Sequence, residues 1–583
     1  MGSILESEFA DDDRRRARGA ATVPDPARFT DLPVEDRQPI GDGRAPRPEY
    51  RSAPGHDAGY GPVDHVPGPT HRLGDRPQPS PGADDFDDDG YYDDHQGGYV
   101  DHRSGYDEWE PEDGASRRWL GGALATVAIL ALVVAGGVLY ASTRGPDVTA
   151  AEVENVDQGA IRESLTAAPP AREQTETSIA SSSVDTDPNI LWVDPVGGSD
   201  TSDGQTQATA WGTLQGAMDQ LQPGQTLHLL SGDYRELLEP GNSHYILNNG
   251  GTADAWVTIK AAPGAAPRVV ATNGNAVEIR ADYVVFEGIE VVGEGFGPDN
   301  PYGWGVLVRG SHHVRITGNR VSQMPVGGIA TVEASNVEIL YNEVFENSYW
   351  GTEQGSGISI WHAVDLGIDA AVDGYHDVIV GNVVYRNENK VYSRFVPNEQ
   401  VITDGNGIII DQTDETGYTG RMLVANNVVF DNGGRGVLVN EASRVDVVHN
   451  TTYGNGRTEG LLGGKTELSA ARSTDVRFLN NLAWSLPGAE SMTMKNVSDI
   501  VMGGNVFVTD IHTGPDTELD LVITEDPGLV NPGLDPLTND FRPLSSSLLV
   551  GQSIPTSPHV PFDADATERP VSGATVGAYQ PMP

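Results

Sequence analysis

Three stretches of the chain, 305–319 (GVLVRGSHHVRITGN), 328–342 (GIATVEASNVEILYN) and 436–450 (GVLVNEASRVDVVHN), repeat one phrase. Each begins with a glycine and a short apolar strand, passes through a turn and ends in a V-x-I-x-x-N type of run, after which a second short strand follows. The closing asparagine recurs at Asn319, Asn342, Asn382, Asn427, Asn450, Asn481 and Asn505. Successive differences are 23, 40, 45, 23, 31 and 24 residues, so the unit is about 23 residues and the longer intervals contain insertions.

A repeat of this length has a physical basis. About 23 residues suffice for three short strands at roughly 3.3 Å per residue, joined by tight turns. One such coil cannot bury its apolar face alone, whereas stacked coils close a continuous core and align equivalent residues in ladders. An asparagine at a turn can then bond backbone groups of its own coil and of the next. The repeat therefore predicts an all-β, parallel β-helix over residues 190–583.

The segment before the clear repeat predicts a strand at 191–193 and one short amphipathic helix that caps the core. Apolar residues recur there at three- and four-residue spacing, namely Trp211, Leu214, Ala217, Met218 and Leu221. The opening from Trp192 to Tyr234 resembles the first segment of right-handed parallel β-helix proteins of the pectin-lyase-like superfamily. The ending is similar to theirs as well, at 526–529 (DPGL), 540–544 (DFRPL), 569–570 (RP) and 577–579 (GAY). The resemblance covers about residues 190–580 and implies a right-handed β-helix.

The first 189 residues divide into three parts. Residues 1–118 are rich in Asp, Arg, Pro and Gly with few aliphatics, which predicts a disordered acidic tail. Residues 119–141 contain no charged side chain and are long enough to cross a bilayer as a helix. Arginines flank the start of this run, so the tail is expected in the cytoplasm and the β-helix outside the cell, in a single-pass membrane protein. Residues 142–189 are expected to be an extracytoplasmic linker.

Composition excludes several classes of function. The chain has 84 acidic and 37 basic residues, a net charge of -47, which argues against general affinity for nucleic acid. It contains no cysteine, so disulfides, thiolate metal sites and cysteine nucleophiles are excluded.

Strand alternation predicts which side chains of the coils face solvent. In the strands that open with glycine, the first and third residues after it are expected inside and the fourth outside. The outward row then comprises Arg309, Val332, Trp361, Asp411 and Asn440, followed directly by Glu333, His362, Gln412 and Glu441. In the superfamily that this chain resembles, a groove along that face commonly binds an extended polysaccharide, and the resemblance implies the same here. Insertions at 363–374, 389–403, 412–420 and 457–471 interrupt coils beside this strand and are expected to wall the cleft.

The densest polar cluster comprises 403–407, Asp411, Asp414 and Glu415, with His362 and Asp365 one coil earlier and Arg435 and Glu441 one coil later. Asp404, Asp411 and Asp414 present hard carboxylate oxygens that could hold Ca²⁺. Carboxyls of this cluster, Asp404 and Asp411 among them, could equally act as the general acid and base of a glycoside hydrolase, and both options fit coils that lie about 4.8 Å apart. A third reading makes 404–407 (DGNG) a tight turn among solvated loop charges.

Lysine is scarce, and three of the four lysines fall in the coils of the expected cleft. A lysine of lowered pKa can abstract the C5 proton of a uronic acid while Ca²⁺ neutralises the carboxylate, which is the chemistry of β-eliminating lyases. Lys465 is the first candidate base and Lys390 the second, with Arg435 and His362 beside them. Each lysine also fits an ordinary surface position, and a lone histidine usually makes only a structural hydrogen bond.

Aromatic and amide side chains are the expected substrate contacts. Trp361, Trp350 and Tyr392 can stack on sugar rings, and Asn440 and Glu441 continue the outward row, although an aromatic here can also simply cover a loop. The catalytic phrases of calcium pectate lyases, polygalacturonases and alginate epimerases are absent, so no catalytic set transfers by resemblance. The leading hypothesis is a cell-surface lyase of an acidic polysaccharide, with a two-carboxylate hydrolase next and a non-catalytic carbohydrate-binding or envelope protein as the alternative of another class.

Overall fold

The computed structural model describes residues 187–236, 243–367, 374–396, 400–509, 520–557 and 559–581. The predicted tail, the predicted membrane span at 119–141 and all but the last residues of the predicted linker lie outside these ranges. Within them, no helix combines the length and the apolar character that crossing a bilayer requires.

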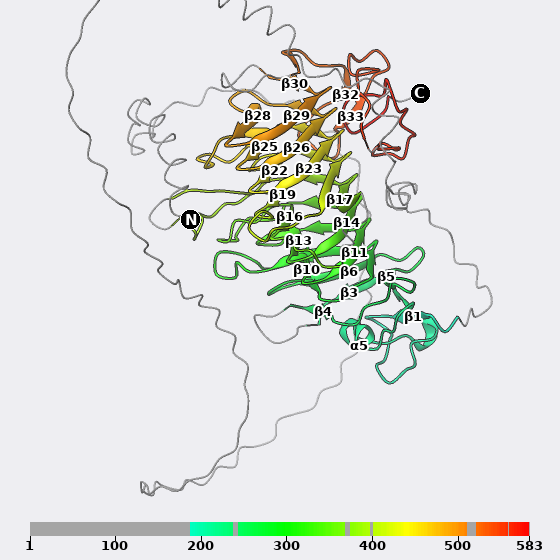
Figure 1. Cartoon of the computed structure of the whole chain (residues 1–583). Helices are drawn as coiled ribbons and strands as arrows, with labels where there is room; N and C mark the ends of the chain where they lie inside the picture. Colours follow the sequence, from blue (N-terminus) through cyan, green and yellow to red (C-terminus); the bar gives the residue numbers. More distant parts are fainter. Residues whose placement is uncertain are drawn as a thin grey trace, which may run out of the picture. The chain divides into compact units, whose positions relative to one another are not determined.

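Three parallel sheets form the body of the domain, and each coil from β4 to β30 contributes one strand to each sheet in the order C, A, B (Figure 1). Sheet C contains β4 (Tyr245–Leu247), β7 (Val277–Ile279), β10 (Trp304–Arg309), β13 (Gly327–Val332), β16 (Ile358–Trp361), β19 (Ile408–Asp411), β22 (Val437–Asn440), β25 (Thr466–Ala471) and β28 (Glu490–Lys495). Sheet A contains β1 (Ile190–Val193), β2 (Thr226–Leu229), β5 (Val257–Ala261), β8 (Val284–Glu287), β11 (His312–Thr317), β14 (Ser335–Leu340), β17 (Tyr375–Val380), β20 (Arg421–Ala425), β23 (Ser443–Val448), β26 (Thr474–Leu479) and β29 (Ser498–Gly503). Sheet B contains β3 (Gly232–Tyr234), β6 (Pro267–Ala271), β9 (Glu290–Gly293), β12 (Arg320–Ser322), β15 (Glu343–Phe345), β18 (Val383–Tyr385), β21 (Val428–Phe430), β24 (Thr451–Tyr453), β27 (Leu482–Trp484), β30 (Val506–Val508) and β31 (Leu521–Ile523). The predicted parallel β-helix is therefore confirmed.

The asparagines that set the repeat form a continuous ladder between sheets A and B. The Oδ1 atom of each one accepts both the backbone N–H and the side-chain amide of the asparagine one coil earlier, as Asn450 does from Asn427 at 3.0 and 2.9 Å. The same pattern joins Asn319, Asn342, Asn382, Asn427, Asn450, Asn481 and Asn505. These side chains are buried, so the ladder satisfies backbone groups that no water reaches. The predicted use of a turn asparagine across two coils is confirmed.

A second ladder, not predicted, lies five residues further along in each coil. It joins Asn347, Asn387, Asn432 and Asn455 through the same bonds. Glu467 ends it, because its two carboxylate oxygens accept the backbone and side-chain N–H groups of Asn455 at 2.9 and 2.6 Å. The recurring spacing of asparagine five residues after asparagine is the sequence signal that reveals it.

The interior is apolar and follows the predicted alternation. The inward residues of the glycine-led strands are all buried, with at most 1 % of their surface exposed: Val306, Val308, Ile329, Thr331, Ile358, Ile360, Ile408, Ile410, Val437 and Val439. A short helix, α5 (Leu214–Met218), packs against the first coils, and its residues Leu214, Ala217 and Met218 are buried. The helix is shorter than the apolar spacing suggests. Trp211 instead forms a parallel bridge with Val193, and Leu221 lies beyond the helix end.

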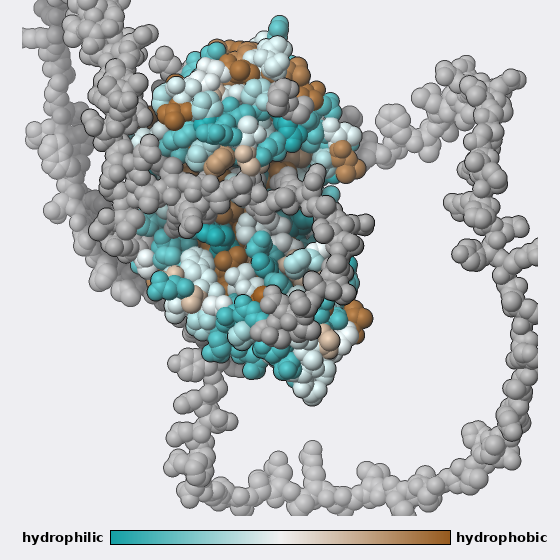
Figure 2. All heavy atoms as spheres, turned by 90° about the vertical axis from the view of Figure 1, so that its right-hand side faces the viewer, coloured by the Kyte–Doolittle hydropathy of each residue, from teal (hydrophilic) through white to brown (hydrophobic). Residues whose placement is uncertain are grey.

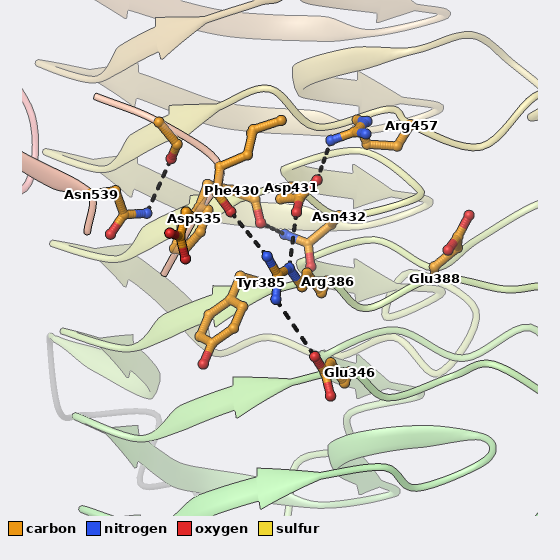
Figure 3. A network of polar contacts seen from close by, with 12 residues as sticks. Glu346, Tyr385, Arg386, Glu388, Phe430, Asp431, Asn432, Arg457, Asp535 and Asn539 are labelled. Atoms are coloured by element: carbon orange, nitrogen blue, oxygen red, sulfur yellow. Dashed lines mark hydrogen bonds and ion pairs between the residues drawn. The ribbon is translucent and has the colours of Figure 1, made fainter. Parts of the chain in front are cut away.

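The C-terminal segment folds back onto the outer face of sheet B. Its strands β32 (Leu529–Asn531) and β33 (Asp540–Pro543) pair antiparallel, and Phe541 of β33 contacts the rings of Phe430 and Tyr453. An ion-pair network fixes the corner beside it: Arg386 lies between Glu346 and Asp431, and Arg457 reaches Asp431 from the next coil (Figure 3). Figure 2 views the side of the molecule that faces right in Figure 1. On the described part of this side, hydrophilic and hydrophobic residues are interspersed, with only small hydrophobic patches.

Candidate functional site

The outer face of sheet C carries the predicted row of side chains in strict register. Arg309 is paired with Val332, Val332 with Trp361, Trp361 with Asp411, and Asp411 with Asn440. The parallel pairing puts neighbouring members of the row one rung apart, roughly 4.8 Å. Side chains far apart in sequence therefore form one ribbon along the domain.

One member of the row is not exposed as predicted. Val332 is buried because it packs with Leu307 and Ala330 in a small apolar cluster outside the β-helix core, which Trp304 covers. Trp361, by contrast, is 40 % exposed, and Asp411 and Asn440 are half-buried. The polar part of the ribbon thus begins at Trp361 and extends toward the later coils.

The loops beside β16, β19 and β22 flank this polar part. Residues 400–407 and 454–465 approach sheet C at the start of these strands, where Ile402 bridges to Leu461. The expected insertion at 457–471 is wrong in its second half, because 466–471 form β25 and pair with β28. Arg435 is buried, and its guanidinium donates to the carbonyls of Thr403 and Leu462, which ties the two loops together.

Asp404 and Asp411 lie before and at the end of β19, close enough that the charge of Asp404 acts on Asp411. Asp411 accepts a hydrogen bond from Asn440 Nδ2 at 2.7 Å. Burial raises its pKa to about 7, with further contributions from the negative charges of Asp404 and Glu441 and an opposing one from Arg472. A carboxyl of this pKa is half protonated at neutral pH.

Asp404 lies in a different environment. Its two oxygens accept hydrogen bonds from Thr403 Oγ1 at 2.9 Å and Asn406 Nδ2 at 2.7 Å. Burial raises the pKa of Asp404 above its usual value, while these two hydrogen bonds and the charge of Arg435 lower it. Asp404 therefore has two donors for its charged form where Asp411 has one.

Polar side chains at the corner after the row complete the site. Glu333, His362, Gln412, Glu441 and Arg472 all have φ between 48° and 54°, a left-handed conformation that is uncommon for residues other than glycine. Arg472 donates to Glu441 and, at 2.9 Å, to Asn440 Oδ1, which orients the amide that contacts Asp411. Sequence reasoning missed Arg472, whose place one coil after Glu441 follows from the register.

Trp361 and His362 are held as a rigid pair. Their rings stack at a centroid distance of 4.2 Å, and Trp361 Nε1 donates to Gln412 Oε1 at 2.8 Å. The Nε2 atom of His362 lies 3.5 Å from a carboxylate oxygen of the exposed Glu415. An exposed indole fixed beside Asp411 is a suitable surface for a sugar ring.

The two predicted catalytic lysines have partners of their own. Lys465 Nζ donates to Glu459 at 2.7 Å, and Lys390 Nζ lies 3.5 Å above the ring of Tyr349 and 3.8 Å from Glu388. In the part of the chain that the structure describes, neither ammonium group forms a hydrogen bond or ion pair with Asp404 or Asp411. Tyr392 is 52 % exposed, and Trp350 is half-buried in the loop before β16.

The three predicted calcium ligands lie on both sides of β19. Asp404 precedes the strand and Asp411 ends it, while Asp414 is exposed on the loop that follows and accepts a hydrogen bond from Ser443. In the ranges that the structure describes, no three histidine, aspartate or glutamate side chains are arranged to hold a metal ion. Calcium binding by Asp404, Asp411 and Asp414 stays a prediction.

Comparison with known proteins gives the following matches. Residues 268–481 match the family model described as "Right handed beta helix region". Similar solved structures include a pectate lyase, Pel9A (18 % identity, 67 % of this chain and 96 % of that chain, TM-score 0.40), a rhamnogalacturonan lyase (16 %, 54 % and 87 %, TM-score 0.39) and XylC in complex with xylose (10 %, 67 % and 98 %, TM-score 0.42). No curated protein matches the chain. The chain thus contains a right-handed β-helix, whose strands build the ribbon described above.

Proposed function

We propose that the outer face of sheet C binds an extended polysaccharide and that Asp404 and Asp411 cleave its glycosidic bonds by acid–base catalysis. The observation that carries the proposal is the half-buried Asp411 on the ribbon, in register with the exposed Trp361, with a second half-buried carboxylate, Asp404, in the loop before β19 and close enough for its charge to act on Asp411. Glycoside hydrolysis uses two carboxyl groups, one protonated and one charged.

The environments of the two carboxylates assign their roles. Asp411 has one hydrogen-bond donor and a pKa of about 7, so it retains a proton for the leaving oxygen near neutral pH. Asp404 has two donors and the nearby charge of Arg435, so it is the better stabilised anion. It is the candidate base or nucleophile.

The structure's contacts favour this chemistry over lysine-based β-elimination. A base for β-elimination has to approach the C5 proton of a bound uronate, and the ammonium groups of Lys465 and Lys390 are engaged by Glu459 and Tyr349. The two reactions leave different products. Hydrolysis yields new reducing ends only, whereas β-elimination also yields an unsaturated sugar that absorbs ultraviolet light.

The test uses the full chain and a panel of neutral and acidic polysaccharides. We expect new reducing ends without ultraviolet-absorbing product, and a loss of about 10²- to 10⁴-fold in kcat for Asp411→Asn. Asp254→Asn, which changes an exposed aspartate in a turn before β5, is the control and should retain full activity. Formation of an ultraviolet-absorbing product would show that the reaction is elimination and not hydrolysis. Full activity of Asp411→Asn would show that Asp411 is not the general acid.

We also propose that the domain acts outside the cell, held by the predicted membrane span at 119–141. The support is the uncharged run and the arginines before it. Protease added to intact cells should then remove the β-helix domain. Complete protection of the domain would contradict this orientation.

A further inference from the structure

A second polar pocket lies on the same outer face, several coils before Asp411. Its cavity of about 290 Å³ is lined by residues of β7 and β10 and of neighbouring loops, among them Ser243, Glu278, Tyr302, Trp304, Arg309 and Glu353. The strand that contributes Glu278 begins with Ala276 where the next coil has Gly305, and the two coils read AVEIR and GVLVR. Both coils thus place an arginine at the outward fourth position.

Two arginines share a single buried carboxylate of this pocket: Arg309, which lines it, and Arg280 one rung earlier. Arg280 Nε lies 2.8 Å and Arg309 Nε 3.2 Å from the same oxygen of Glu278, while Ser243 Oγ donates to the other oxygen at 2.6 Å. Burial raises the pKa of Glu278, but the bonds and charges of Arg280, Ser243 and Arg309 outweigh it and hold the pKa below its usual value. These two arginines and Glu278 consequently carry an excess of one positive charge, because Glu353, the other carboxylate that lines the pocket, is paired with Arg394 at 3.3 Å.

The ion-pair network on sheet B shows the contrast (Figure 3). There, Arg386 and Arg457 meet two carboxylates, Glu346 and Asp431, so the charges balance. Around Glu278 they do not balance. In a chain whose net charge is -47, two guanidinium groups that share one carboxylate are a local departure from the overall negative charge.

The arginines are also positioned to bind. Each is 47 % exposed, and among the described residues their terminal Nη groups have no hydrogen-bond partner. Because each Nε is fixed on Glu278, the planar end of each guanidinium is oriented before any ligand arrives. Such forks match the two oxygens of a carboxylate.

An aromatic surface lies beside them. Tyr302 is 53 % exposed and lines the pocket, next to the half-buried Trp304. Arg309 is three rungs from Asp411 along the row, through Val332 and Trp361, a distance of roughly 14 Å. Only a chain of several sugar units spans that distance.

We propose that Arg280, Arg309 and Tyr302 form a binding subsite for an acidic sugar unit, with the two guanidinium groups on its carboxylate and the phenol ring against its face. The inference deepens the proposed function and rests on it only in assigning both sites to one bound chain. It makes the substrate an acidic polysaccharide that is cleaved several units from the recognised carboxylate.

The experiment measures binding, so that it is separate from catalysis. Full-length protein carrying Asp411→Asn is titrated by calorimetry with oligogalacturonate, oligomannuronate and oligoglucuronate, and with each after reduction of its carboxyl groups to alcohols. We expect at least one acidic oligosaccharide to bind about tenfold more tightly than its reduced form. Added salt should weaken only the acidic one.

Variants assign the effect to the pocket. Arg280→Gln and Arg309→Gln each leave one arginine on Glu278, which preserves the fold, and each should weaken binding of the acidic form about three- to tenfold without changing the reduced form. Arg320→Gln is the matched control, because Arg320 is an exposed arginine on sheet B with its own partner Glu343. Tyr302→Ala should weaken both forms.

Two results would overturn the subsite. One is the absence of binding by all three acidic oligosaccharides; the other is unchanged binding by both single arginine variants. Either can occur while Asp411 is still shown to be catalytic on a neutral glycan. Conversely, the protein could prove inactive on every glycan while Arg309→Gln still weakens binding of the acidic sugar. That result would contradict the proposed reaction and support the subsite.

Discussion

The inner asparagine ladder and the outer pair Asp404 and Asp411 are both rows of polar groups that coil stacking brings together, yet their chemistry is opposite. In the ladder, each buried amide donates and accepts to the full, as Asn427 does with Asn382, Asn450 and Ile379. On the outer face, Asp411 has one donor for two oxygens and a pKa of about 7. The same register thus fully satisfies the buried amides of the ladder, while on the outer face it leaves a carboxyl whose charged form is poorly stabilised.

Breaking the ladder should give the largest change in stability. Asn427→Ala removes the acceptor of the Asn382 backbone N–H and the donor to the Ile379 carbonyl, which leaves two buried groups unpaired. We expect a loss of roughly 3–5 kcal/mol in the free energy of unfolding, measured by urea denaturation. Asn300→Ala, which removes one exposed hydrogen bond to Thr272, should cost less than about 1 kcal/mol. Equal costs for the two variants would contradict the role of the ladder.

The end of the second ladder should give stability a pH dependence. Glu467 is fully buried, and burial raises its pKa from 4.5 to about 8. Because the folded state binds this proton more tightly than the unfolded state, the free energy of unfolding should fall as pH rises from about 4.5 to 8. We expect a loss of roughly 2 kcal/mol or more, since one pKa unit corresponds to about 1.4 kcal/mol.

Asp411 is half protonated at pH 7 and still contributes to the slope above that pH, so the contribution of Glu467 is measured between pH 7 and 8 in an Asp411→Asn background. In that background, Glu467→Gln should abolish the slope. A wild-type protein equally stable at pH 5 and pH 8 would show that the carboxyl of Glu467 does not titrate as described.

The outer carboxylate should behave in the opposite way to the ladder. Ionised Asp411 is unfavourable in the folded state, so Asp411→Asn should raise the free energy of unfolding at pH 8 by about 1 kcal/mol while it removes activity. Between about pH 4 and 7, wild-type stability falls with rising pH, and the variant should lack this contribution. A lower free energy of unfolding for the variant at pH 8 would show that Asp411 stabilises the fold, as the ladder asparagines do.

The smallest effect is expected at Trp361. Loss of the exposed indole should raise KM about three- to tenfold with little change in kcat or stability, because stacking on a sugar contributes only about 1 kcal/mol. Trp361→Phe, which keeps an aromatic ring, should recover part of the affinity. An unchanged KM for Trp361→Ala on the preferred polymer would show that the substrate does not contact this side chain.

Much of this arrangement follows from the sequence, because it depends on period alone. The asparagine spacing and the glycine-led strands predicted the ladder, the inward core and the register of Trp361, Asp411 and Asn440. The burial of Val332 escaped prediction because it depends on Trp304, which covers it from another position in the coil.

What the sequence did not reveal depends on contacts between distant segments. Glu459 and Tyr349 engage the two candidate lysines, and spacing gives no sign of either contact. The pocket around Glu278 was missed because its coil opens with Ala276 instead of glycine, although the matching AVEIR and GVLVR runs carry the signal.

The ladder also separates the scaffold from what is attached to it. Successive asparagines meet equally well whether they are 23 or 45 positions apart in the sequence, as the bonds from Asn427 to Asn450 and from Asn382 to Asn427 show. Chain inserted at the corner 412–420 therefore leaves the pitch of the solenoid untouched. Such a molecule is suited to diversification, in nature or by grafting, because new surface loops can be exchanged without redesigning the support beneath them.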